Sequence, residues 1–233
     1  MLDEINIQNV LFLDIETVPQ VYNYADLPGN LKALWDNKWQ YNKEITAQEQ
    51  YKKSGIYAEF AKIICISVGF FKNDVFRMKS FYGDDEKQVL LDFKNLLDQH
   101  FNKKEHLLCA HNGKEFDFPF ICRRMLINGV QIPKILNIAG KKPWEVAHLD
   151  TMELWKFGDY KNYTSLNLLA AVFNIPTPKD EISGSDVARV YYEEKDLEKI
   201  KRYCCKDVVT VARILQKYKT QEAVTEDKIE LTD

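Results

Sequence analysis

The stretch Val10-Leu11-Phe12-Leu13-Asp14-Ile15-Glu16-Thr17 decides the fold, because an apolar run leads directly into two carboxylates two positions apart. An apolar run of this length predicts a strand that is buried on both faces within a sheet. Strand side chains alternate between faces, so Asp14 and Glu16 share one face. Paired carboxylates repel each other and are costly to desolvate, so we expect a divalent cation between them. The simpler alternative is that the strand ends at Leu13 and both acids are solvated, so the rest of the chain has to decide.

Length and composition limit the class of protein. A chain of 233 residues suits one α/β domain with an elaboration, or at most two small domains. Its 45% hydrophobic and 29% charged residues are ordinary for a soluble globular protein. The net charge of −3 argues against a broad basic surface for duplex DNA, but it leaves room for a localised binding groove.

Cysteine spacing and the N-terminal residues indicate the compartment. The five cysteines have no CxxC spacing and lie mostly in apolar runs, which is typical of reduced core residues. Residues 1–4 lack the basic start of a signal peptide, and no apolar run approaches the roughly 20 residues that span a bilayer. We therefore expect a cytoplasmic protein with no membrane partner, no zinc site and no disulfide framework.

Residues from 20 to about 60 interrupt the α/β pattern. They are rich in aromatic and amide side chains, and the spacing of Leu31, Leu34 and Trp35 is helical. This spacing predicts a helical insertion that packs over one edge of the core. Lysines between the aromatics leave open a second interpretation, in which the insertion stacks unpaired bases, but a packed helix pair is favoured.

The remaining chain predicts a mixed sheet flanked by helices, in one domain over residues 1–220. The predicted elements are strands at 63–71, 75–82, 107–110 and 146–150, and helices that begin near 86, 118, 166 and 194, the last ending near 218. The tail, residues 221–233, holds five acids and one lysine, so we expect it to be frayed or flexible.

The last predicted helix carries an acid on its apolar face. Its stripe consists of Leu197, Ile200, Cys204, Val208, Val211, Ile214 and Leu215. Asp207 interrupts this stripe, and Tyr203 lies one turn earlier on the same side. A carboxylate that faces the core needs a partner, although a position at the rim paired with a lysine is the alternative.

Four further polar residues flank predicted strand ends. Asp117 begins a helix, where an aspartate is also a common N-terminal cap. Asp150 fits a cap, or a residue behind the ligands, better than a ligand. His111 and His148 are expected to be structural more often than to touch a substrate.

Together these residues resemble the three motifs of the DEDD-type 3′→5′ exonucleases: Asp14-Ile15-Glu16, Asn112 through Phe116-Asp117, and Tyr203-x-x-x-Asp207. Arg202 stands where the histidine class has its histidine, so the resemblance is to the tyrosine class. Within it, the chain looks most like the stand-alone exonucleases similar to the proofreading domain of family B DNA polymerases. That closer likeness covers about residues 8–218 and rests on Phe60–Ile63, Ser165–Leu169, Pro176–Asp180 and Ser183–Ser185.

The resemblance implies a ribonuclease H-like fold with the acids at one end of the sheet. It implies two divalent cations, Mg²⁺ or Mn²⁺, with Asp14 bridging both and Asp117 holding the second, partly through water. Glu16 and Asp207 would complete the part of the site that activates water, and Tyr203 would orient the attacking water. Asn112 and Phe116 would contact the terminal nucleotide.

The expected reaction is removal of nucleoside monophosphates from the 3′ end of single-stranded DNA. Two alternatives remain on the same fold: a 3′→5′ exonuclease for RNA, and a catalytically silent module that binds nucleic acid. A third interpretation, that the protein is a protein-interaction domain, is supported only by the aromatic insertion at 20–60. The sequence contains no polymerase domain, so a proofreading role would need a separate polymerase or repair partner.

Overall fold

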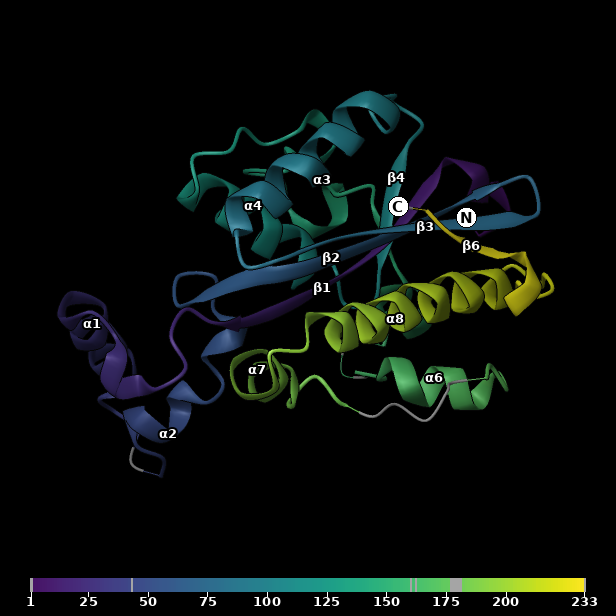
Figure 1. Ribbon diagram of the computed structural model, residues 1–233. Coiled ribbons are helices and arrows are strands. Elements are labelled where there is room, and N and C mark those ends of the chain that lie inside the picture. The colour runs from purple at the N-terminus through teal and green to yellow at the C-terminus, as the bar shows by residue number, and fades with distance from the viewer. Residues whose placement is uncertain (1, 43, 160, 162, 177–181, 233) are drawn as a thin grey trace.

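The computed structural model describes residues 2–42, 44–159, 161, 163–176 and 182–232 (Figure 1). Its centre is a mixed sheet with the strand order β5-β4-β1-β2-β3-β6. The strands are β1 (Val10–Pro19), β2 (Ala61–Lys72), β3 (Val75–Tyr82), β4 (Leu107–Ala110), β5 (Leu149–Asp150) and β6 (Ile229–Leu231). β1 pairs antiparallel with β2 and parallel with β4, so the predicted mixed sheet is confirmed.

Helices cover both faces of this sheet, with α3 and α4 on one side and α6 and α8 on the other (Figure 1). The α-helices are α1 (Gly29–Trp39), α2 (Ala47–Tyr51), α3 (Glu86–His100), α4 (Asp117–Ile127), α5 (Thr151–Lys156), α6 (Leu166–Val172), α7 (Val187–Arg189) and α8 (Leu197–Tyr218). The short turns of helix are η1 (Leu2–Glu4), η2 (Ile7–Asn9), η3 (Tyr24–Asp26), η4 (Ser54–Ile56), η5 (Lys134–Leu136), η6 (Pro143–Glu145), η7 (Val190–Glu194, π-helical) and η8 (Glu226–Lys228). None of the helices in the described ranges is long and apolar enough to cross a membrane.

The alternation within β1 determines which layer each of its side chains enters. Leu11 and Leu13 belong to the core cluster that includes residues of α3 and α4. Val10 and Phe12 belong to the cluster that includes residues of α8. Because strand side chains have a period of two, Asp14 and Glu16 continue the face that meets α8.

The insertion at 20–60 is a small helical unit with an aromatic centre. Trp35 is fully buried, and its indole N–H donates to the carbonyl oxygen of Ala47 at 2.7 Å. The rings of Tyr51 and Phe60 lie 5.5 and 4.9 Å from the Trp35 ring, in T-shaped contacts. The packed-helix interpretation is therefore confirmed for this centre, since the rings pack on each other.

The C-terminal residues differ from the prediction. Ile229–Leu231 form β6, which pairs parallel with β3, and Arg77 forms an ion pair with Glu230 at 3.1 Å. The expectation of a frayed tail is wrong for residues 226–231. An acidic composition predicts poor burial, but it does not reveal that the exposed edge of β3 is available for main-chain pairing.

Two other boundaries shift. β5 is only two residues long, shorter than the strand expected at 146–150. α8 begins at Leu197 because Lys195 is in the left-handed region, with φ 56°, and the Asp196 side chain accepts from the backbone N–H of Lys199. Pro178–Asp180 of the quoted motif lie outside the described residues.

Candidate active site

Three elements bring the predicted acids close together. β1 presents Asp14 and Glu16 toward α8, which carries Asp207, while Asp117 is the first residue of α4. Burial raises the pKa of Asp14 well above its ordinary value, and the charges of the other three acids raise it further. The charge of one carboxylate raises the pKa of another only when the two groups lie close together. We call Asp14, Glu16, Asp117 and Asp207 the carboxylate cluster.

Asp14 and Glu16 both lie on β1, which is an inner strand of the sheet between β4 and β2. Burial, then the charges of Cys65, Asp207 and Asp117, raises the pKa of Glu16 as well. Opposite Glu16, the pairing of β1 with β2 shifts register between Glu16 and Thr17, an irregularity often found beside active sites. The main influences on both pKa values are burial and neighbouring acidic groups, and no lysine or arginine of the described ranges is among them.

Asp117 is buried at the start of α4. Burial raises its pKa to about 7, and backbone hydrogen bonds from its own N–H and from Ile15 act in the opposite direction. The cap position of α4 is held by Phe116, which makes no capping bond through its side chain. Asp117 is therefore inside the helix, one position beyond the cap that the alternative interpretation assigned to it.

Tyr203 lies beside the cluster on α8. Burial, followed by the charges of Asp207, Glu16 and Asp14, raises the pKa of its hydroxyl, which hydrogen-bonds to Asp207. A tyrosine in this environment stays protonated near neutral pH, so it acts as a hydrogen-bond donor and not as a base.

Cys204 is the group that the sequence interpretation missed. Its thiol lies 3.4 Å from both the carbonyl oxygen and Oδ2 of Asp14. Its sulfur and one carboxylate oxygen each from Asp14 and Glu16 lie within 4.8 Å of one another. The sequence assigned Cys204 to the apolar stripe because buried cysteine is common in cores. Its position between Tyr203 and Asp207 on the same helix was the available signal.

The cluster fits hard divalent cations. Carboxylate oxygens are ligands that Mg²⁺ and Mn²⁺ prefer, and a cation among these buried acids would relieve the repulsion that raises their pKa values. The thiol of Cys204 adds one softer donor beside Asp14 and Glu16.

Asn112 lies in the turn between β4 and α4, with φ 62°. Its backbone N–H donates to Oδ1 of Asp150 at 2.9 Å, and that of Lys114 donates to Oδ2 at 3.1 Å. Asp150 also accepts from the backbone N–H groups of Met152 and Glu153, so the expectation that it caps a helix is confirmed. Asp150 thus holds the turn that carries Asn112.

Phe116 and the two histidines have packing or structural contacts. Phe116 is half-buried, and its ring lies 5.2 Å from that of Phe120. His111 hydrogen-bonds to the Thr151 hydroxyl and to the Thr164 carbonyl oxygen. His148 accepts from the backbone N–H of Leu108, and burial lowers its pKa to about 4. The structural interpretation of both histidines agrees with these bonds.

A mixed sheet between two helical layers, with carboxylates from β1, α4 and α8 at one place, defines a ribonuclease H-like fold. The chain belongs to the family described as "Predicted 3'-5' exonuclease related to the exonuclease domain of PolB", which matches residues 56–230. This confirms the predicted family. The matched range begins after Asp14 and Glu16, so the family match does not include the first motif.

A solved structure of a DNA polymerase supports this fold. The family B DNA polymerase from the hyperthermophilic archaeon Pyrobaculum calidifontis has a TM-score of 0.56 at 16% identity, over 91% of this chain and 24% of the polymerase chain. This chain therefore spans about a quarter of that polymerase, and the likeness concerns the fold alone. A structure of the yeast NOT1 MIF4G domain co-crystallized with CAF1 has a TM-score of 0.42 at 14% identity, over 96% of this chain and 84% of that chain. The comparison with curated proteins found no match.

Proposed function

We propose that this protein is a metal-dependent exonuclease of the tyrosine class that removes nucleoside monophosphates from the 3′ end of single-stranded DNA. The observation that carries the proposal is the carboxylate cluster, in which burial and mutual repulsion raise the pKa values of Asp14, Glu16 and Asp117. The nucleic-acid substrate follows from membership of the exonuclease family.

The four carboxylates would hold two divalent cations, Mg²⁺ or Mn²⁺. Bound cations would supply a lowered pKa for the attacking water and a positive charge for the leaving 3′ oxygen. The protonated hydroxyl of Tyr203 orients that water while it stays hydrogen-bonded to Asp207. Asn112 and Phe116 contact the terminal nucleotide and align its phosphodiester bond.

We further propose a cytoplasmic location, supported by the free state of the five cysteines. A separate polymerase or repair partner is part of this proposal, supported by the likeness of the fold to 24% of the chain of a family B DNA polymerase.

Digestion of end-labelled oligonucleotides tests the proposal. With Mg²⁺ or Mn²⁺, the wild-type protein is expected to shorten 5′-labelled single-stranded DNA from its 3′ end. Asp14→Asn removes a charge that neutralises the cations, so it should reduce the rate at least about 100-fold. Asp98→Asn, at an exposed position on α3, is the matched control and should leave the rate unchanged.

Two outcomes separate the alternatives. Equal inactivity of wild type and Asp14→Asn would overturn the enzymatic proposal and favour the binding module. A faster reaction on an RNA oligomer of the same sequence would replace DNA by RNA as the substrate.

A further inference from the structure

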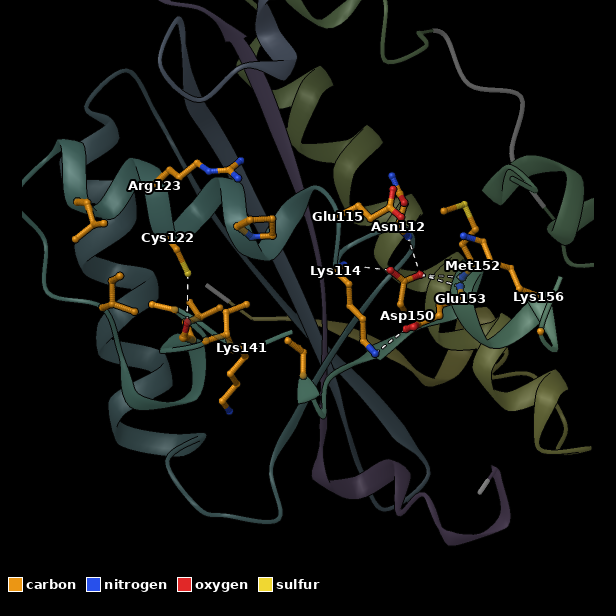
Figure 2. A pocket seen from close by; sticks show the side chains of 18 residues that line it. Asn112, Lys114, Glu115, Cys122, Arg123, Lys141, Asp150, Met152, Glu153 and Lys156 are labelled. Atoms are coloured by element: carbon orange, nitrogen blue, oxygen red, sulfur yellow. Dashed lines mark hydrogen bonds and ion pairs between the residues drawn. The ribbon is translucent and has the colours of Figure 1, made fainter. Parts of the chain in front are cut away.

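A cavity of about 720 Å³ lies beside the carboxylate cluster, between α4, the segment 132–146 and α5 (Figure 2). We call it the side cavity. Asn112 and Asp150 line it, and the charge of Asp150 also raises the pKa of Asp117. The cavity therefore adjoins the cluster, although none of the four carboxylates lines it.

The walls of the side cavity are largely apolar. They include side chains from α4, from the following segment and from α5, among them Leu126, Leu136, Ile138 and Met152. Leu126 is 67% exposed, so it adds accessible apolar surface to this lining. A surface of this kind suits the flat face of a nucleobase.

The lining of the cavity carries one more cation than acids, with Lys114, Arg123, Lys141 and Lys156 against Glu115, Asp150 and Glu153. Lys114 is neutralised by Glu153 at 2.6 Å, and the oxygens of Asp150 accept from four backbone N–H groups. Arg123 and Lys141 are exposed, and neither forms an ion pair within the described part of the chain. Figure 2 shows Arg123 and Lys156 on opposite sides of the cavity. Cations that stand over an apolar wall are suited to phosphate groups.

Asn112, which lines the cavity, has an unpaired hydrogen-bond acceptor. Its Oδ1 is buried and has no hydrogen-bond partner among the described residues. Buried amide oxygens without a partner are costly, and a ligand with an N–H group relieves that cost. The exocyclic amines and ring N–H groups of nucleobases are donors of this kind.

Two exposed aromatic residues are neighbours in the chain of residues that line the cavity. Trp144 and Phe157 are 76% and 81% exposed, and each lies in the chain between residues that line the cavity. Phe157 has φ 44°, a conformation that side chains of this size rarely adopt. Aromatic rings interleaved with lysines provide stacking surfaces for unpaired bases.

We propose that the side cavity binds the nucleotides of the single strand that lie on the 5′ side of the one being removed. Their bases pack on the apolar walls and near Trp144 and Phe157, and their phosphates contact Arg123 and Lys141. The 3′ nucleotide occupies the carboxylate cluster and is the end of the strand, so any nucleotide held next to it lies on its 5′ side. This inference rests on the proposed function and adds a second binding region to it.

Binding without hydrolysis gives the first test. The affinity of a fluorescein-labelled ten-nucleotide oligothymidylate is measured by anisotropy in EDTA, for wild type and for Arg123→Glu/Lys141→Glu. We expect at least tenfold weaker binding by the double variant. The slope of log affinity against log salt concentration should also fall by about 1.4, the value for two phosphate contacts on a single strand. Lys103→Glu/Lys104→Glu makes the same change of charge in the exposed turn before β4 and should have little effect.

Hydrolysis of two substrates gives the second test. The p-nitrophenyl ester of thymidine 5′-monophosphate carries one nucleoside and needs only the carboxylate cluster, whereas the ten-nucleotide strand also reaches the side cavity. We expect kcat/KM of the double variant to fall at least tenfold on the strand and to stay unchanged on the ester.

The outcomes separate the two proposals. Wild-type protein that hydrolyses neither substrate contradicts the proposed function, while the anisotropy measurement still reports on the cavity. The side-cavity proposal is overturned if wild type fails to bind the strand in EDTA, if both double variants weaken binding equally, or if the ester and the strand are affected alike.

Discussion

The thiol of Cys204 lies 3.4 Å from Oδ2 of Asp14 and 3.4 Å from the carbonyl oxygen of the same residue. This contact joins α8 to β1 at Asp14, whose pKa is raised by the charges of three other carboxylates. Cys204 is fully buried, and it lies one turn before Asp207 on α8. It therefore holds both the carboxylate and the backbone of Asp14 against the helix that carries another member of the cluster.

We expect Cys204→Ala to weaken divalent-cation binding by about tenfold, because groups that hydrogen-bond to metal ligands orient them. Cys204→Ser keeps a donor at this position and should retain more of the affinity. The measurement is the rise in melting temperature as Mn²⁺ is added. Cys109→Ala, which removes a buried thiol on β4 outside the carboxylate cluster, is the control. Equal losses in Cys204→Ala and Cys109→Ala would show that packing alone is responsible.

The stability of the metal-free protein should depend on pH through Asp117. Burial raises the pKa of this carboxyl from 3.8 to about 7. Between about pH 4 and 7 the unfolded chain has lost this proton and the folded protein retains it, so the free energy of unfolding falls as pH rises. Melting temperatures in EDTA across this range should therefore decline more steeply for wild type than for Asp117→Asn. Identical slopes would mean that Asp117 does not titrate there.

Divalent cations should reverse this loss. They bind the deprotonated carboxylates of the folded protein, so their stabilising effect is expected to be larger above about pH 7 than near pH 5. Thermal melts with and without Mg²⁺ at both pH values measure the difference. A shift of the same size at both values would contradict binding at these carboxylates.

A buried ion pair joins α3 and α4 to the start of β2. The Arg124 guanidinium donates to both carboxylate oxygens of Glu86, at 2.8 and 2.6 Å, and to the carbonyl oxygen of Ala58 at 2.7 Å. Glu86 also accepts from the backbone N–H of Ile63 at 2.7 Å. Arg124→Leu leaves a buried carboxylate without its cation, so it should lower the free energy of unfolding by about 3–5 kcal/mol.

Chemical denaturation measures this loss. The double variant Glu86→Leu/Arg124→Leu removes both charges and should cost less than the sum of the two single changes. Additive losses would show that the two residues stabilise the fold independently.

Gly113 permits the tight turn that leads into α4. A Cβ atom at this position would lie 2.4 Å from Cβ of Ala110 and 3.1 Å from the ring of Phe118. Gly113→Ala should therefore shift the turn that carries Asn112 and leads to Asp117. We expect it to lower the free energy of unfolding by about 1–3 kcal/mol. We also expect it to reduce exonuclease activity, because the shifted turn displaces both residues. Gly29→Ala, where a Cβ meets nothing within 4 Å, is the control for denaturation and activity assays. Unchanged activity in Gly113→Ala would show that the turn tolerates the shift.

Several features followed from local patterns in the sequence. The alternation in Val10–Leu13 placed these side chains in two core layers and directed Asp14 and Glu16 toward one face, because strand geometry has a period of two. The apolar stripe of α8 likewise placed Asp207 and Tyr203 on the side that faces the sheet, because helical geometry repeats every 3.6 residues. The roles of these residues in catalysis remain predictions, and the Asp14→Asn variant tests that of Asp14.

Only the tertiary structure decided the remaining features. The contact of Cys204 with Asp14, the pairing of β6 with β3 and the side cavity each join residues far apart in the chain. Local periodicity specifies which way a side chain points from its own element, but not which distant element it meets. The stretch around Asp14 therefore determined by itself one strand and the direction of two acids. Packing of α4 and α8 against that strand decided that four acids, a thiol and a tyrosine share one site.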